Sequence, residues 1–494
     1  MGASTTFSPK LALGVMGGQV DVTGLRSTLR DGAALGALAF ALCLGALSAA
    51  SAETLDSALA RAYRGNPTLG AQRASVRATD ENVPRALSLG RPRVSATADI
   101  GAEYTETRAE FGPALTSRGG INKNFTTTYP RGAGVEVDQT LFNGNRTVNT
   151  TRQAESQVLG ARETLRNTEQ TVLFNGAQAY MNVLRDTAIL NLQRNNVEVI
   201  EEQLRQTRDR FNVGEVTRTD VAQAEARLAA GQSQVSLAES NLRASMALFR
   251  QVIGVEPRQL APGRPLDRLL PRSVDVAIDV GLREHPAVLS ALHAVDVAEL
   301  QVKVTEGELF PTLGITGSVT ERFDTQVPGT ETFTASAVAR LTVPIYEGGE
   351  VYARVRQAKE TVGQRRIEAE VTRDQVRATV VSAWGQLEAS RAQIIAAQAQ
   401  VQAAEVALSG VREEARVGQR TTLDVLNAQQ ELLTARVNLI TAQRDRVVNS
   451  FAVVQAMGRL STRAMSLDIA QYNAREHFDQ VKDLWIGVRT PDGR

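Results

Sequence analysis

Few side chains in this sequence are of the types that do chemistry, and their spacing does not assemble a reactive site. The histidines are His285, His293 and His477, and the first two are off the spacing that converges on a metal ion. The single cysteine, Cys43, lies in an N-terminal apolar run, so thiol catalysis, disulfides and cysteine metal sites are not expected. The sequence has no GxxxxGK(S/T) loop, GxSxG elbow or HExxH pair. We therefore expect no enzymatic activity, no cofactor and no metal.

Charged side chains do recur at one matched position in two segments of the chain. FNVGEVTRTDV aligns with ARVGQRTTLDV, which superposes Gly214 on Gly418 and Asp220 on Asp424. In a generic coiled coil, such charges cap the starts of helices and are solvated. The same offset aligns LFNGN with IYEGG, so one structural unit is predicted to occur twice.

Each unit is predicted to run helix, two strands, long helix, turn, helix. We expect a signal peptide at 1–52, a first repeat at 53–260, a linker at 261–273, a second repeat at 274–461 and a tail at 462–494. The signal peptide is indicated by Arg26 and Arg30, a short apolar run and a small-residue cleavage site at 50–52. Leu42 before Cys43 argues against a lipid anchor, and Met16 is an alternative start.

Long helices are predicted in two proline-free stretches. The stretch 146–211 as one helix would be on the order of 100 Å long, which no globular domain accommodates. Helices over 55–89 and 218–253 would together match that length, as expected for the wall of a cylinder. Apolar residues every seven positions predict coiled-coil seams. The seams are Val221, Leu228, Val235, Leu242 and Phe249, and Leu426, Leu433, Ile440, Val447 and Val454.

Between the helices, four segments alternate apolar and polar residues, which predicts strands. They lie at about 93–105, 129–142, 312–323 and 333–345, with aromatic residues near their ends. A soluble sandwich has the same alternation, whereas aromatic girdles are typical of membrane barrels. Gln139 interrupts the apolar face of the second segment. Because four strands cannot close a barrel around a pore, a barrel would need several chains, and three would supply twelve strands.

Composition excludes one class of partner and limits how the chain can enter a membrane. Lys and Arg number 55 against 54 Asp and Glu, so no net field favours nucleic acid. After residue 53 no run of about 18 apolar residues occurs, so any membrane-spanning part must be built from strands.

These motifs together resemble the TolC family of outer-membrane channels. The resemblance rests on FNVG at 211–214, ARVGQRTTLDVLNAQ at 415–429, AYMNVL at 179–184 and LFNGN at 141–145. The tail at 472–487 is similar to that of members paired with type I secretion systems. The resemblance implies a homotrimer in the Gram-negative outer membrane, with a twelve-stranded barrel above a twelve-helix periplasmic tunnel. It also implies a passive exit channel for type I protein secretion or multidrug efflux, opened by a periplasmic adaptor and an inner-membrane transporter of ABC or RND type.

Site residues follow from the same resemblance. Those matching the polar network of the periplasmic gate are Gln203, Thr219, Asp220 and Arg420. Asp424 matches the acidic ring at the closed entrance. The positions matching hairpin turns and adaptor docking are Val213, Gly214, Val417 and Gly418. Asn427 stands where a second acidic ring can occur, and Ala415 where a tyrosine can brace the closed state, so we expect weaker cation selectivity and a looser gate.

A different class of protein shares part of this pattern. A periplasmic coiled-coil adaptor or scaffold without a pore would have the same signal peptide and heptads. It would lack four lipid-facing strands flanked by aromatics, and it would be soluble without detergent.

Overall fold

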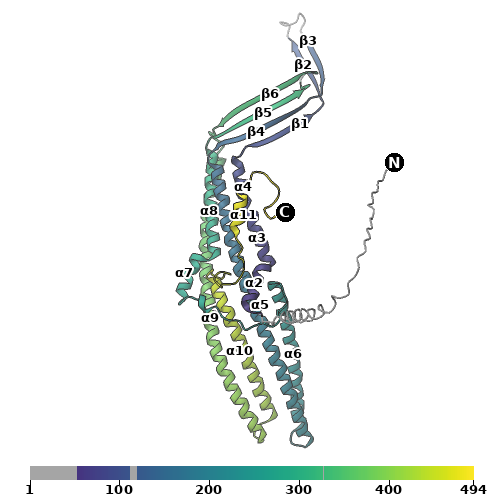
Figure 1. Cartoon of the computed structure of the whole chain (residues 1–494), viewed down its shortest axis with the longest axis vertical. Coiled ribbons are helices and arrows are strands. Elements are labelled where there is room, and N and C mark those ends of the chain that lie inside the picture. The colour runs from purple at the N-terminus through teal and green to yellow at the C-terminus, as the bar shows by residue number, and fades with distance from the viewer. Residues whose placement is uncertain (1–52, 112–119, 326, 494) are drawn as a thin grey trace, which may run out of the picture. The chain divides into compact units, whose positions relative to one another are not determined.

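In the computed structural model, helices and strands occupy separate regions of the molecule, although they alternate along the sequence (Figure 1). It describes residues 53–111, 120–325 and 327–493, and these belong to one unit that begins at Glu53. The predicted signal peptide at 1–52, with Met16 and Cys43, lies outside the described residues.

The helices follow the order expected from the sequence, with more breaks. They are α2 (Leu55–Gly65), α3 (Pro67–Asp80), α4 (Asn82–Leu87), α5 (Arg146–Asn212), α6 (Arg218–Ile253), α7 (Val274–Glu284), α8 (Pro286–Glu306), α9 (Glu350–Arg416), α10 (Thr422–Ala456) and α11 (Ala474–Val481). Short 3-10 turns are η1 (Ser88–Gly90), η2 (Asp267–Leu269) and η3 (Gly307–Leu309). Helix α5 has 67 residues and lies within one residue of the predicted 146–211.

The prediction of a single helix over 55–89 was wrong, because the chain there is divided into α2, α3, α4 and η1. The first break has a local cause. Pro67 has no N–H to continue the hydrogen bonding of α2, so it begins a new helix. Asn66 caps that helix, since its Oδ1 accepts from the N–H of Thr68 at 2.9 Å.

Two antiparallel hairpins, α5 with α6 and α9 with α10, extend away from the strands (Figure 1). In α6, the predicted seam residues are half-buried except Phe249, which is fully buried. Four small residues, each three positions after one of the half-buried seam residues, are more deeply buried. They are Ala224, Gly231, Ala238 and Ser245. Small side chains at these positions let the partner helix approach closely, so this second heptad position forms the tighter contact.

The strands form two sheets. They are β1 (Arg93–Ile100), β2 (Glu103–Phe111), β3 (Gly120–Thr128), β4 (Arg131–Asn143), β5 (Thr312–Phe323) and β6 (Glu331–Thr342). One antiparallel sheet has the order β1-β4-β5-β6, and β2 pairs with β3 in a second. The first predicted strand therefore ends at Ile100 and not near 105. The chain turns there, with the N–H of Gly101 bonded to the carbonyl of Pro130 at 2.8 Å.

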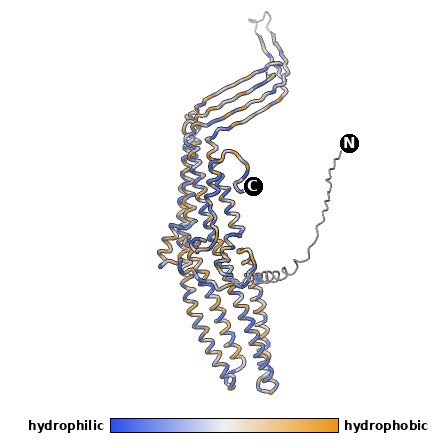
Figure 2. The backbone as a smooth tube through the Cα atoms, in the orientation of Figure 1, coloured by the Kyte–Doolittle hydropathy of each residue, from blue (hydrophilic) through white to orange (hydrophobic). Residues whose placement is uncertain are grey.

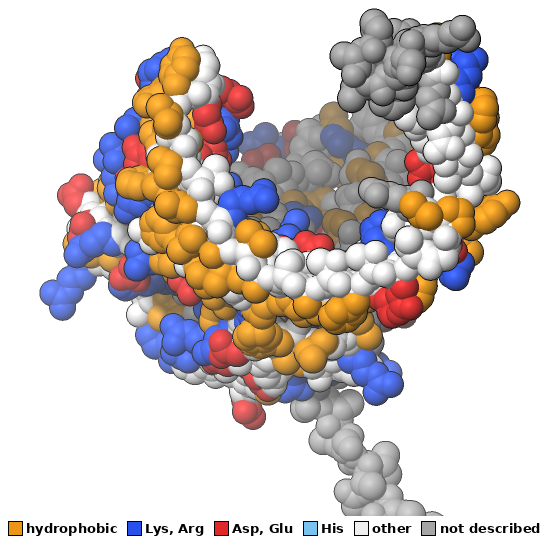
Figure 3. Space-filling model, turned by 90° about the horizontal axis from the view of Figure 1, so that it is seen from above, with side chains coloured by type: hydrophobic (Ala, Val, Ile, Leu, Met, Phe, Trp, Pro, Cys, Tyr) orange, Lys and Arg blue, Asp and Glu red, His pale blue; other side chains and the backbone are white. Residues whose placement is uncertain are grey.

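The register of the four-stranded sheet places the apolar residues on one face. Val94 lies opposite Val137, Val135 opposite Val319, and Val319 opposite Ala335. Apolar side chains follow the convex side of the curved strands in Figure 3, with polar groups lining the hollow side. Gln139 falls on the apolar face near its helical end, and its amide donates to the carbonyl of Gly90 at 2.9 Å.

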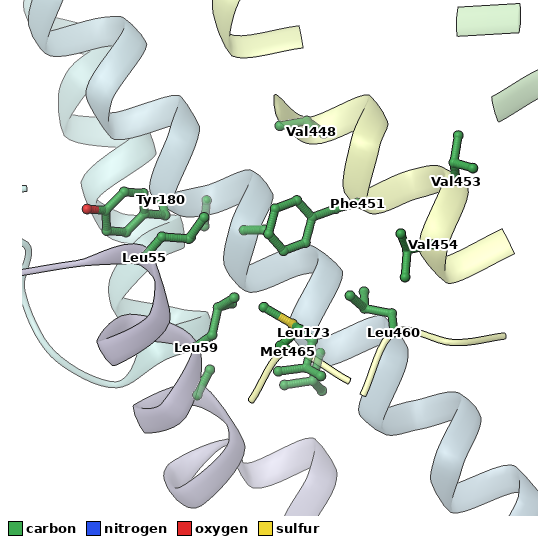
Figure 4. Close-up of a cluster of buried hydrophobic side chains, with 14 of the residues drawn as sticks. Leu55, Leu59, Leu173, Tyr180, Val448, Phe451, Val453, Val454, Leu460 and Met465 are labelled. Carbon is green, nitrogen blue, oxygen red and sulfur yellow. The ribbon is translucent and has the colours of Figure 1, made fainter. Parts of the chain in front are cut away.

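The largest apolar core lies where the helices meet between the sheet and the hairpins. Figure 4 shows Leu59, Leu173, Tyr180 and Phe451 converging from α2, α5 and α10. The hydroxyl of Tyr180 lies 2.6 Å from the carbonyls of Glu53 and Ala261, and burial raises its pKa to about 12. This core joins α2, the first helix of the described residues, to the long helices.

No helix among the described residues is long and apolar enough to cross a bilayer. Figure 2 shows polar and apolar positions interspersed along the helices.

Candidate functional site at the helical hairpins

Each hairpin turn is built around a glycine in the left-handed region. Gly214 has a φ of +82° and Gly418 a φ of +78°. In both turns the glycine N–H bonds to the carbonyl three residues back, and the next N–H to the carbonyl five residues back. This is a Schellman motif, in which a residue without Cβ avoids the strain of positive φ.

The residues before these glycines project into solvent. The exposed fraction is 72% for Val213 and 65% for Val417. No neighbouring atom lies within 4 Å of where a Cβ would stand on Gly214 or Gly418. The turns therefore offer two small apolar surfaces that this chain leaves uncovered.

Asp220 and Asp424 both take part in capping boxes. The carboxylate of Asp220 accepts from the N–H of Thr217 at 2.9 Å, and that of Asp424 accepts from the N–H of Thr421 at 3.0 Å. The two threonine hydroxyls cap the N–H groups of the aspartates in return. Bonding from Thr217 and Thr421 lowers the pKa of both carboxyls, so each keeps its negative charge at neutral pH. The cap role weighed from sequence is thus present in both hairpins.

The four residues assigned to the gate network are not joined to one another within this chain. Arg420 bonds to Glu414 of its own hairpin, with 2.8 Å between Nε and Oε2. Asp220 is engaged by Thr217, while Thr219 is exposed. The backbone carbonyl of Gln203 accepts from Thr207 at 2.7 Å. Among residues 53–493 as described, no hydrogen bond or ion pair links these four.

Other residues connect the two hairpins. The guanidinium of Arg227 in α6 donates to Oδ1 of Asn427 in α10 at 2.7 Å. Two residues further along α10, the amide nitrogen of Gln429 donates to Oδ1 of Asn196 in α5 at 3.2 Å. The side-chain oxygen of Gln429, Oε1, is buried without a hydrogen-bond partner in the described chain. These contacts are polar and incompletely paired, and each hydrogen bond of this kind contributes only about 1 kcal/mol to stability.

A small apolar cluster supports these polar contacts. Leu204, Ala224 and Leu426 are buried together, with Val221 and Leu228 packed against them. The residues come from α5, α6 and α10, so this cluster spans both hairpins. It lies closer to the turns than the large core does, and it is much smaller.

Sequence reasoning missed the connecting role of Arg227, Asn196 and Gln429. Asn427 was noted only because it is not acidic. The available signal was a set of polar residues beside the heptad seam, but their partners lie about 200 positions away in the sequence. Among the described residues, no group of three His, Asp or Glu side chains is arranged to hold a metal ion.

Paired long helices under an antiparallel sheet with one apolar face are the fold of outer-membrane channels. The structure of the Campylobacter jejuni CmeC outer membrane channel matches with a TM-score of 0.70 at 18% identity, over 87% of this chain and 89% of that one. The chain belongs to the outer membrane efflux protein family, whose sequence profile matches residues 58–255 and 277–459.

Curated relatives agree with this membership. The outer membrane efflux protein BepC of Brucella suis is 42% identical over 449 residues, covering 90% of this chain and 94% of the relative. The outer membrane protein TolC of Escherichia coli is 28% identical over 466 residues, covering 91% and 90%. The predicted family, outer-membrane location and export function are confirmed, and the relatives are channel and transport proteins.

Proposed function

We propose that three copies of this chain form the exit channel of a tripartite export system, with four strands from each copy closing a twelve-stranded barrel. The observation that carries the proposal is the pair of open sheet edges. β1 and β6 each pair on one side only among the described strands. In hydrocarbon, unpaired backbone N–H and C=O groups cost several kcal/mol each, so a neighbouring copy must pair them. Twelve strands also leave a lumen, which four cannot.

The two faces of the sheet support this placement. The apolar convex face suits lipid, and the hollow face suits water. On the polar face, the hydroxyl of Thr316 donates to Asp138 at 2.7 Å, and Ser318 and Ser336 are 2.8 Å apart. Polar side chains bonded to one another in this way are typical of a water-filled channel.

The helices of the three copies would form a tunnel of twelve helices. Along α9, large apolar side chains are exposed at positions that one chain does not cover: Ile367, Val371, Ile395 and Val406. Neighbouring copies would bury them. An internal duplication accounts for the two hairpins, because α5 and α9 both have 67 residues, and α6 and α10 have 36 and 35.

The hairpin ends would act as the gate at the periplasmic end of the tunnel. Three copies of Asp424 around one axis would concentrate negative charge and favour cations. The network assigned to Gln203, Thr219, Asp220 and Arg420 would then form between copies. Within each copy, the contact of Arg227 with Asn427 holds the two hairpins together, and opening would require its separation.

The partners follow from the exposed turns. A periplasmic adaptor would dock at Val213, Gly214, Val417 and Gly418, and an inner-membrane transporter of ABC or RND type would supply energy. The channel itself is a passive conduit without a cofactor. Its cargo is either protein, as in type I secretion, or small molecules, as in multidrug efflux, and the tail at 472–487 favours the former.

Purification of the mature chain from outer membranes tests the proposal. We expect a trimer that dissociates on heating in SDS and that forms ion-conducting pores in planar bilayers. Monomers that stay in solution without detergent would contradict it and would favour the coiled-coil scaffold.

A further inference from the structure

The first part of the C-terminal tail is held against α2 and α3. The N–H of Tyr472 donates to the hydroxyl of Tyr63 at 3.1 Å. The guanidinium carbon of Arg73 lies 4.6 Å from the ring centre of Tyr63 and 5.1 Å from that of Tyr472. The tail therefore follows a defined path from its first aromatic residue.

Helix α11 fixes the next part of the tail. Nδ1 of His477 lies 3.0 Å from the carboxylate of Asp80, a side chain with no solvent exposure. Phe478 packs on a cluster that includes Val83 and Val158, and its ring lies 5.1 Å from the guanidinium carbon of Arg162. The apolar residues of this helix are thus covered by α3, α4 and α5.

The apolar residues that follow α11 are not covered. The exposed fraction is 67% for Trp485, 93% for Ile486 and 100% for Val488. Their backbone is nevertheless held in place, because Arg91 donates to the carbonyl of Leu484 at 2.6 Å. The same guanidinium lies 4.6 Å from the ring centre of Trp485. A segment that is fixed in position but left apolar and exposed is expected to have a partner outside this chain.

The position of this segment identifies the partner. Arg91 lies two residues before the start of β1, and the neighbouring Gly90 accepts the hydrogen bond from Gln139 on the apolar face of the sheet. In Figure 1 the tail after α11 rises toward the foot of the four-stranded sheet and then turns back. The segment therefore continues the apolar face of the sheet at its helical end.

We propose that residues 484–488 insert into the membrane interface around the sheet, in the leaflet that faces the helices. This inference rests on the proposed placement of the sheet in the bilayer. Tryptophan is enriched at this depth because its ring is apolar and its N–H is polar. The adjoining exposed Arg489 would meet lipid phosphate groups. The tail would thereby fix the position of the helices relative to the surface of the membrane.

Tryptophan fluorescence tests the inference directly. The chain has two tryptophans, so the difference in emission between the wild-type protein and Trp485→Phe reports on Trp485 while Trp384 stays in place. The protein is reconstituted into vesicles of ordinary phosphatidylcholine or of phosphatidylcholine brominated at defined acyl positions. We expect the Trp485 signal to fall in brominated vesicles, with a larger loss when the bromines lie near the headgroup than near the chain end.

Two matched controls use the Trp485→Phe background. Val319→Trp, near the middle of the apolar face of β5 and opposite Val135 and Ala335, should lose emission to deep bromines, and Val417→Trp at a hairpin turn should lose none. If Val319→Trp is quenched and Trp485 is not, the tail is not in lipid, although the sheet is. If neither is quenched, the placement of the sheet fails as well. A Trp485 that resists both brominated lipid and aqueous iodide would be covered by protein, which also overturns the inference.

Discussion

Arg227 and Asn427 are 200 residues apart in sequence, yet the arginine guanidinium donates to the asparagine Oδ1 at 2.7 Å. The contact joins α6 of one hairpin to α10 of the other. An acidic residue at position 427 would strengthen the attraction to Arg227, whereas the neutral amide provides a hydrogen bond without a full ion pair. The neutral residue at position 427, where the resemblance allows a second acidic ring, thus goes with a weaker contact between the hairpins.

Removing this contact should favour the open channel. Because both side chains are partly in water, we expect Arg227→Ala to shift the gate by about 1 kcal/mol or less, or up to roughly fivefold in the ratio of open to closed states. Single-channel recording in planar bilayers measures the change. Arg436→Ala is the matched control, because Arg436 bonds to Glu405 within one hairpin. Equal effects of both variants would contradict a role between hairpins.

Arg420 offers a second test of the gate. Replacing it with alanine should raise conductance if it binds a neighbouring copy in the closed trimer. The control is Glu414→Gln, because this substitution weakens only the ion pair seen within the hairpin. Asp220→Ala should resemble Arg420→Ala if the two residues belong to one network. Unchanged conductance in well-folded trimers would remove Arg420 from the gate.

Charge at the entrance can be separated from helix capping. Asp424→Asn keeps an oxygen that can accept from Thr421 but removes the charge, so cation preference should fall. Reversal potentials under a salt gradient measure this cation preference. Asp220→Asn is the matched control, because it makes the same change in the other hairpin. The pKa of Asp424 is lowered by its bonds from Thr421. In the wild-type channel, cation preference should therefore persist to a pH below the ordinary Asp pKa of about 3.9.

His285 should make stability depend on pH. Its Nδ1 accepts from the N–H of Ala287 at 3.1 Å and caps α8, a role that protonation abolishes. Burial, followed by the charge of Arg166, lowers the pKa of His285. The stabilising contribution is therefore complete above the unfolded pKa of about 6.5 and is lost as the pH falls through the lower folded pKa.

The matched variant for this test is His285→Asn, since Asn66 already caps α3 in the same way before Pro67. We expect the melting temperature of the wild-type protein to fall relative to that of the variant between about pH 7 and pH 5. Thermal unfolding in detergent provides the measurement. A constant difference across this range would show that His285 does not titrate in the folded protein.

Local patterns predicted most of the elements. Seven-residue spacing indicated α6 and α10, and alternation indicated which residues share a face of β5. Less was predictable where a local signal competed with a match of lengths. Asn66 and Pro67 carry the signal for a helix start, but one helix over 55–89 was predicted because its length, added to that of 218–253, matched 146–211.

The sequence by itself determined the units: helices of matched length, glycine turns at Gly214 and Gly418, and strands with one apolar face. These depend on backbone dihedrals and on side-chain period, which a short segment contains in full. Only the tertiary structure decided that β4 pairs with β5 across the two halves, that Arg420 bonds to Glu414, and that Arg227 reaches Asn427. Such contacts join distant segments, and their geometry follows from how whole helices and strands pack.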